Sequence, residues 1–329
     1  MVNRREAIRA FLGLGIALAP LPLPAQSPRR IGVLHRPDGC FIPGRLCAEE
    51  FVRAMKELGY VEGRHYIYDF KEWQSLAQIE DLVRDLVRQN VALIIAAAPP
   101  SIMGAKNVTT TVPIVFAYSA EPVAIGLARS LARPGGNLTG LTWDHGFEFT
   151  VKAMELLKET LPTIRRVAAL WDGTDSVHPI YAKYYEKAAL QMGVNFISLE
   201  VRTADDFEPA FARSRQQKAD ALIVLPSAQL TLPRRDEVMA LASREKLPTL
   251  GANVVSLFPN AMLHYGPNHA NTPRRLASYV DRIIKGGNPG ELPIEQPDKY
   301  DLVVDLKVAK ELGIKVPGSI LVRADRVIK

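Results

Sequence analysis

Buried-strand patterns alternate with amphipathic helical patterns along most of the chain. Residues 91–96 form a continuous apolar run that predicts a strand covered on both faces, whereas 47–58 places apolar residues at helical spacing before Gly59. Alternating strands and helices favour parallel sheets. The expected strands are 30–34, 65–70, 91–96, 113–117, 138–142, 167–171, 194–199, 221–225, 248–250 and 261–265, and the expected helices are 47–58, 79–89, 101–106, 123–131, 147–161, 179–192, 204–215 and 235–245.

The alternation starts twice, with the long helical pattern at 147–161 near the change-over. Two such units predict an α/β fold made of two doubly wound parallel-sheet lobes with a cleft between them. In open parallel sheets, ligands bind beyond the carboxyl ends of the strands. The residues that follow each predicted strand are therefore the first candidates for a site.

The first residues have the three-part layout of an export signal. Arg4, Arg5 and Arg9 precede the apolar run 10–23, which is shorter than the roughly 20 apolar residues of a membrane span. We expect cleavage after Ala25, so that 1–25 is a signal peptide and the mature protein is soluble and periplasmic. Arg4-Arg5 matches the twin-arginine pattern in part. The alternative, an amphipathic first helix of a cytoplasmic domain, is disfavoured because the run has no polar face.

Composition and motifs favour binding over catalysis. The 329-residue chain carries a net charge of +6, but its basic residues are dispersed, so nucleic acid is not an expected partner. We find no dinucleotide or phosphate-loop glycine pattern and no Gly-x-Ser-x-Gly motif, and we expect no cofactor and no catalytic residue. Cys40 and Cys47 lack a nearby histidine pair, so no metal site is expected; they form either a disulfide or two free thiols.

Three stretches carry a family resemblance. They are 58–63 (Leu-Gly-Tyr-Val-Glu-Gly), 130–142 (Ser-Leu-Ala-Arg-Pro-Gly-Gly-Asn-Leu-Thr-Gly-Leu-Thr) and 292–297 (Leu-Pro-Ile-Glu-Gln-Pro), the last followed by 300–307 and 323–325. In this order and spacing they resemble the substrate-binding proteins of a bacterial ABC transporter family that includes tryptophan-binding-like proteins. The similarity spans nearly the whole mature chain.

The resemblance implies a type I periplasmic binding fold with a hinge of several crossings. Lobe 1 would hold 29–143 plus about 267–295, and lobe 2 would hold 144–266 plus about 296–329. A small solute, such as an amino acid or an aromatic or carboxylate compound, would be caught by lobe closure. The expected protein partners are the permease and ATPase subunits of an importer, and the binding protein itself is expected to be monomeric.

Polar candidates for the site follow the predicted strands. A free helix N-terminus suits a carboxylate, and Ser101 is placed for this role or for plain helix capping. Glu121 is expected to hold a ligand ammonium, although many relatives would have Asp there. Relatives also tend to have Thr-Pro at 99–100, where this chain has Pro-Pro and lacks a hydroxyl and a backbone donor. Further candidates are Arg36, Ser119, Asp172, Ser227 and Asn253, of which Asp172 has an equal alternative in capping the helix near Val177.

Aromatic candidates flank the change-over. Trp143 and Trp171 are expected to stack on an apolar or aromatic ligand, with lobe packing as the alternative. Tyr118 and Tyr265 are expected to face each other across the cleft.

Three other functions stay open at this point. An exported sensor domain reporting to a membrane receptor would use the same fold. A transferase using an activated sugar is disfavoured by export away from its donor. A cytoplasmic repressor is disfavoured because no helix-turn-helix precedes the first strand.

Overall fold

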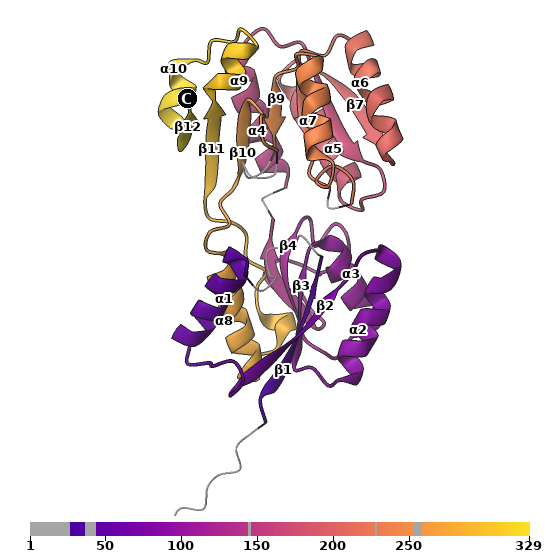
Figure 1. Cartoon of the computed structure of the whole chain (residues 1–329), viewed down its shortest axis with the longest axis vertical. Helices are drawn as coiled ribbons and strands as arrows, with labels where there is room; N and C mark the ends of the chain where they lie inside the picture. Colours follow the sequence, from indigo (N-terminus) through magenta and orange to yellow (C-terminus); the bar gives the residue numbers. More distant parts are fainter. Residues whose placement is uncertain (1–26, 37–43, 144–145, 228, 253–257) are drawn as a thin grey trace, which may run out of the picture.

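Two α/β lobes lie one above the other in the computed structural model (Figure 1). The structure describes residues 27–36, 44–143, 146–227, 229–252 and 258–329. The proposed signal peptide, Cys40 and Asn253 lie outside these ranges, so the cleavage site and the pairing of Cys40 with Cys47 stay predictions.

Lobe 1 is built on a five-stranded parallel sheet of order β2-β1-β3-β4-β5. Its β3 is buried along almost its whole length, as its apolar run predicts. The helices α1 and α8 contribute to the core on one face, and α2 and α3 to the core on the other. The elements are β1 (Arg29–His35), α1 (Leu46–Glu57), β2 (Tyr66–Glu72), α2 (Ile79–Arg88), β3 (Leu93–Ala97), α3 (Pro99–Val108), β4 (Ile114–Ser119), β5 (Leu138–Thr142) and α8 (Thr272–Ile284), with short 3₁₀ turns at Leu76–Gln78 and Pro289–Glu291.

Lobe 2 is built on a seven-stranded sheet of order β12-β11-β10-β9-β8-β6-β7. The predicted strands of this sheet pair in parallel, and β11, which was not predicted, runs antiparallel to β10. The elements are α4 (Phe147–Thr160), β6 (Arg166–Asp172), α5 (His178–Gln191), β7 (Asn195–Val201), α6 (Phe207–Gln216), β8 (Ala221–Val224), α7 (Arg235–Arg244), β9 (Thr249–Gly251), β10 (Leu263–Pro267), β11 (Tyr300–Asp305), α9 (Leu306–Glu311), α10 (Gly318–Arg323) and β12 (Arg326–Ile328), with a 3₁₀ turn at Ala204–Asp206.

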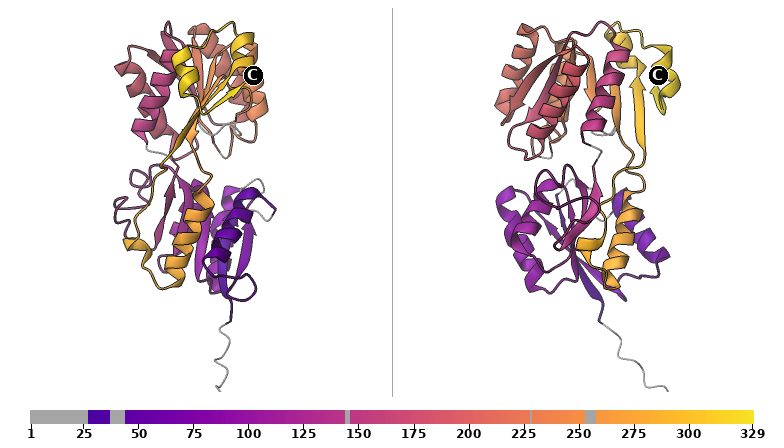
Figure 2. Two further views of the ribbon diagram at one scale, coloured as in Figure 1. Left: turned by 90° about the vertical axis from the view of Figure 1, so that its left-hand side faces the viewer. Right: turned by 180° about the vertical axis from the view of Figure 1, so that it is seen from behind.

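The chain passes between the lobes after β5, after β10 and before β11. Consequently α8, which follows β10 in sequence, packs against α1 and β4 in the first lobe. Figure 2 shows this orange-gold helix among the purple elements of lobe 1. The residue boundaries of the lobes given above stay a prediction.

The predicted helix at 123–131 is wrong. The structure has turns there, and both Leu127 N–H and Ala128 N–H donate to the carbonyl of Pro122. Gly126 has a φ of +72°, which ends the helical path after a single turn. The apolar pattern of this segment reflects burial of Leu127 and Ala128 in the lobe 1 core, not a helix face.

Candidate ligand site between the lobes

A cavity of about 180 Å³ lies where the carboxyl ends of the two sheets meet. Both lobes contribute to its wall, as the rule for open parallel sheets predicts. Lobe 1 supplies Ala98, Pro99, Tyr118, Ala120 and Trp143, and lobe 2 supplies Phe149, Asp175, Val177, His178, Tyr181, Tyr185, Leu225, Pro226, Leu232 and Ala252.

The lobe 1 wall is an aromatic cluster. The Tyr118 ring meets Trp143 edge to face at 5.3 Å and His269 at 4.8 Å, and Trp143 and His269 are 4.6 Å apart between centroids. Burial, helped by the nearby charge of Arg275, lowers the pKa of His269 to about 4. This ring is therefore uncharged near neutral pH and adds to an apolar wall.

Strained backbone supports the lobe 1 wall. Ala98, Tyr118 and Glu121 have φ values of +82°, +64° and +47°, which non-glycine residues rarely adopt. An irregularity in the pairing of β4 with β5 falls between Phe116 and Ser119, so it includes Tyr118. Such strain and bulges gather at functional sites, where they re-aim side chains.

The lobe 2 wall is held by a buried hydrogen-bond network. Asp172 N–H donates to His178 Nδ1 at 3.0 Å, so the ring hydrogen is on Nε2, which donates to the Pro226 carbonyl at 3.2 Å. The Asp172 carboxylate accepts from Thr174 N–H and Oγ1 and from Ser227 Oγ. Asp172 and Ser227 are fully buried, so they order this wall and do not line the cavity.

Asp175 bonds the backbone at the start of the helix α5, whose N-cap is Val177. Its Oδ1 accepts from Val177 N–H at 2.8 Å and from His178 N–H at 3.3 Å. The alternative predicted for Asp172, capping near Val177, is wrong, because its carboxylate bonds Thr174 and Ser227 and the bonds near Val177 come from Asp175. Asp175 lines the cavity and is partly exposed.

The helix α3 begins at Pro99, with Ala98 as its N-cap. The capping alternative for Ser101 is therefore wrong, because Ser101 is already the third helical residue. Its buried Oγ accepts from Trp73 Nε1 at 2.9 Å. Pro99 and Pro100 have no N–H, which leaves the first turn of α3 poor in donors.

Glu121 connects the two lobes. Its carboxylate bonds the side chain of Tyr184 on α5, and its burial, reinforced by the charge of Glu148, raises its pKa although the Tyr184 bond opposes the shift. Gly146 permits this approach, because a Cβ there would lie 2.0 Å from Glu121 Oε1.

Several predicted site residues lie elsewhere. Trp171 donates from Nε1 to Ser198 Oγ at 2.8 Å and lines a different cavity. Tyr265 stacks with Phe149 and with Tyr300, which also contact each other, and it is not part of the described cavity wall that holds Tyr118. The structure places Arg36 over the Trp73 ring at 5.6 Å, and Ser119 is fully buried. Among the predicted residues, Tyr118 and Trp143 are those that the described cavity wall brings together.

The sequence prediction missed the contribution of the helices. Phe149 on α4 and Tyr181 and Tyr185 on α5 line the cavity, but they do not follow a strand directly. The available signal was the spacing of Tyr181 and Tyr185, which lie one helical turn apart near the start of the helix after β6.

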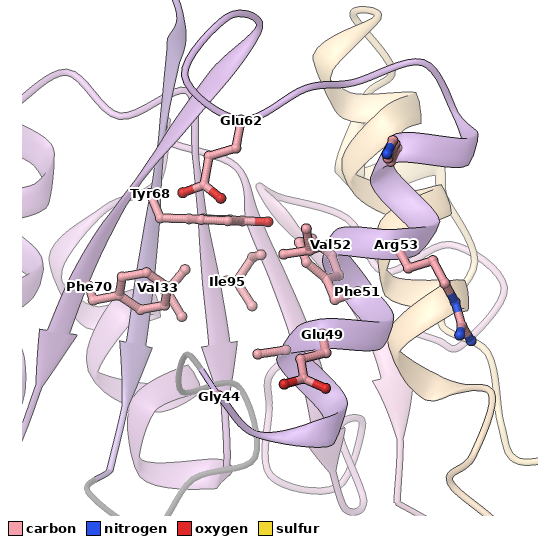
Figure 3. A pocket seen from close by; sticks show the side chains of 12 residues that line it. Val33, Gly44, Glu49, Phe51, Val52, Arg53, Glu62, Tyr68, Phe70 and Ile95 are labelled. Atoms are coloured by element: carbon pink, nitrogen blue, oxygen red, sulfur yellow. The ribbon is translucent and has the colours of Figure 1, made fainter.

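A larger cavity of about 450 Å³ lies within lobe 1, between α1 and the sheet. In Figure 3 the Tyr68 ring lies beneath Glu62, while Val33, Phe70 and Ile95 come from the sheet behind it. Its described lining comes from one lobe, so lobe closure would not enclose a solute there. Gly44 in its wall borders 37–43, which are outside the described residues.

Membrane-spanning helices and metal clusters are both absent from the described ranges. No described helix has the length and apolar character needed to cross a membrane. In the same ranges, no cluster of three or more His, Cys, Asp or Glu side chains is arranged to hold a metal ion.

Two lobes with an apolar cavity between them define a solute-binding protein. The model of the ABC transporter substrate binding protein family matches residues 45–328, and the chain belongs to that family. Its function is accordingly to bind the substrate of an ABC transporter, without catalysis.

Individual relatives are distant. The chain is 22% identical over 266 residues to a tyrosine-binding protein of Clostridioides difficile, covering 80% of this chain and 76% of that protein. It is similar in structure to a conserved domain protein of Vibrio cholerae (TM-score 0.80, 24% identity, 91% and 99% coverage). It is also similar to an ABC domain in complex with L-Trp from Streptococcus pneumonia (TM-score 0.77, 21% identity, 91% and 100% coverage). These structures confirm the predicted two-lobed type I periplasmic binding fold.

Proposed function

We propose that this protein captures a small aromatic solute in the cavity between its lobes in the periplasm and delivers it to the membrane permease of an ABC importer. The observation that carries the proposal is the aromatic wall, to which lobe 1 gives Tyr118 and Trp143 and lobe 2 gives Phe149, Tyr181 and Tyr185. Aromatic rings prefer offset or edge-to-face partners, which such a wall offers from two sides.

The volume and the relatives support the same class of solute. About 180 Å³ is below the roughly 300–1,000 Å³ of sites for drug-sized ligands and suits a compact molecule. Two distant relatives are a tyrosine-binding protein and an ABC domain in complex with L-Trp, and both of these ligands are aromatic. The predicted export signal at 1–25 supports the periplasmic compartment.

Thermal unfolding of the protein isolated after export tests the proposal. We expect an aromatic solute at a hundredfold excess over its Kd to stabilise the protein by roughly 2.7 kcal/mol. Trp143→Ala should weaken binding about tenfold, because it removes one side of the wall. Trp171→Phe is the matched control, since Trp171 lies away from this cavity, and it should bind like the parent. The absence of any shift across a panel of aromatic amino acids, amines and acids would contradict the proposal.

A further inference from the structure

Acidic side chains supply the charge in the described lining of the inter-lobe cavity and of its neighbour. Asp175 is the charged residue in its described wall. A neighbouring cavity of about 260 Å³ shares Pro99 and Asp175 with it and adds Glu80. Glu121 of lobe 1 is the next residue after Ala120, which is part of the cavity wall. A negative solute would therefore meet repulsion at this site.

Basic side chains do not offset these carboxylates in the wall. Neither cavity has Lys or Arg in its described lining. The internal segments outside the described ranges, 37–43, 144–145, 228 and 253–257, contain no Lys or Arg in the sequence. Arg36, predicted as a site residue, lies over Trp73 and is not part of either lining.

The backbone donors that usually bind a carboxylate are also few or occupied. The first two residues of α3 at the cavity are Pro99 and Pro100, which have no N–H. At the start of α5, the N–H groups of Val177 and His178 donate to Asp175. His178 Nε2–H is engaged by the Pro226 carbonyl. A ligand carboxylate would find few partners and would lose its hydration.

A positive solute would find partners at the same place. Both bonds of Asp175 to the start of α5 end on Oδ1, and no described residue donates to its Oδ2. The aromatic rings of the wall present negative π-faces, which attract ammonium groups, most strongly when water is excluded.

We propose that the solute is an organic ammonium ion with an aromatic body and no carboxylate, that is, an aromatic amine instead of a zwitterionic amino acid. The inference rests on the proposed function and narrows its solute class. Asp175 binds the ammonium group, and the rings of both lobes enclose the aromatic body.

Calorimetric titration with matched probes tests the inference. Tryptamine and tyramine should bind at least tenfold more tightly than tryptophan and tyrosine, and indole-3-acetate should bind most weakly. Tighter binding of the amino acids than of the amines would overturn the inference and leave the proposed function standing. Failure of every aromatic probe to bind would overturn the proposed function itself.

Asp175→Asn tests the residue assignment. Asparagine also caps helices well, so α5 should keep its start. We expect this variant to lose at least tenfold in tryptamine affinity and to bind neutral indole like the parent. Asp205→Asn, at an exposed acidic position, is the control and should keep tryptamine affinity. Unchanged tryptamine binding by Asp175→Asn would overturn the role of Asp175.

Pro100→Ala tests whether the missing N–H donors at the start of α3 exclude a ligand carboxylate. It restores one backbone donor at the start of α3, so tryptophan should gain several-fold relative to tryptamine. An unchanged ratio would overturn the argument that the two prolines exclude the carboxylate.

Discussion

Ala98 combines a φ of +82° with a ψ of 146°, a region that is nearly confined to glycine. We predict that Ala98→Gly stabilises the protein by about 1 kcal/mol, because glycine adopts this conformation without strain. Urea unfolding measures the change. Ala97→Gly in β3 is the control and should destabilise by about 0.5–1 kcal/mol, as glycine does within strands. Equal destabilisation by both variants would show that Ala98 is not strained.

Buried His264 makes stability depend on pH. Burial lowers its pKa to about 4, although the nearby charge of Asp305 opposes the shift. The unfolded chain, with a histidine pKa near 6.5, binds more protons between pH 6.5 and 4, so stability falls as pH falls through this window. The full effect is on the order of 3 kcal/mol. We predict that His264→Gln flattens the fall in unfolding free energy; an unchanged slope would contradict this.

Residue by residue, the sequence identified part of the site. Tyr118 and Trp143 were predictable because they lie at the ends of strands whose apolar patterns are clear. Trp171 also lies near the end of a strand, β6, and was predicted for the same reason. Successive side chains of a strand point to opposite faces of the sheet, and the face that Trp171 occupies leads to a different cavity. A difference of one position along the strand decides whether a side chain reaches the inter-lobe cavity. The apolar pattern of a strand that is buried on both faces does not show which positions face the cavity. The role of Asp175 depends on where α5 starts.

Among the elements, α8 is joined to the last crossing by a charged pair. Arg275 donates from Nε and Nη2 to Glu295 Oε2 and from Nη2 to the Gln296 carbonyl. We predict that Arg275→Lys destabilises by about 1 kcal/mol, because lysine does not reproduce this planar arrangement. Arg274→Lys is the matched control: its side chain is 52% exposed, against 27% for Arg275, and should show no measurable change in urea unfolding. Similar effects of both variants would contradict the prediction.

Elements with strong periodicity were predictable, whereas turns and the C-terminal part were less so. The pattern at 79–89 predicted a helix, and the structure has α2 at Ile79–Arg88. Of the residues expected to face inward, Val83 and Leu86 are buried, whereas Leu82 and Val87 are half-buried. The 123–131 prediction failed because apolar residues buried in a turn imitate helical spacing. The helices and strands after residue 267 were not predicted from local patterns, although the family resemblance assigned about 267–295 to lobe 1 and about 296–329 to lobe 2.

For the whole molecule, the Glu121–Tyr184 bond joins the lobes. We predict that Tyr184→Phe weakens solute affinity several-fold, because it removes a contact that favours the closed arrangement of the lobes. Small-angle scattering should show a larger radius of gyration for the variant. Tyr60→Phe, which removes a bond to Asp281 within lobe 1, is the control. Unchanged affinity and size would show that this contact does not bias closure.

The position of α8 in the sequence also determines when lobe 1 can complete its core during synthesis of the chain. A ribosome completes the five strands of lobe 1 at Thr142, but Leu276, Tyr279 and Val280 of the same core emerge only after β6 to β10. At roughly 5–20 residues per second, the part of this sheet face that α8 covers stays exposed for seconds, although α1 is already present. During that interval the nascent chain exposes an apolar surface that only a chaperone or premature association would cover. Shortened chains that end before residue 272 should therefore aggregate even though every strand of lobe 1 is present.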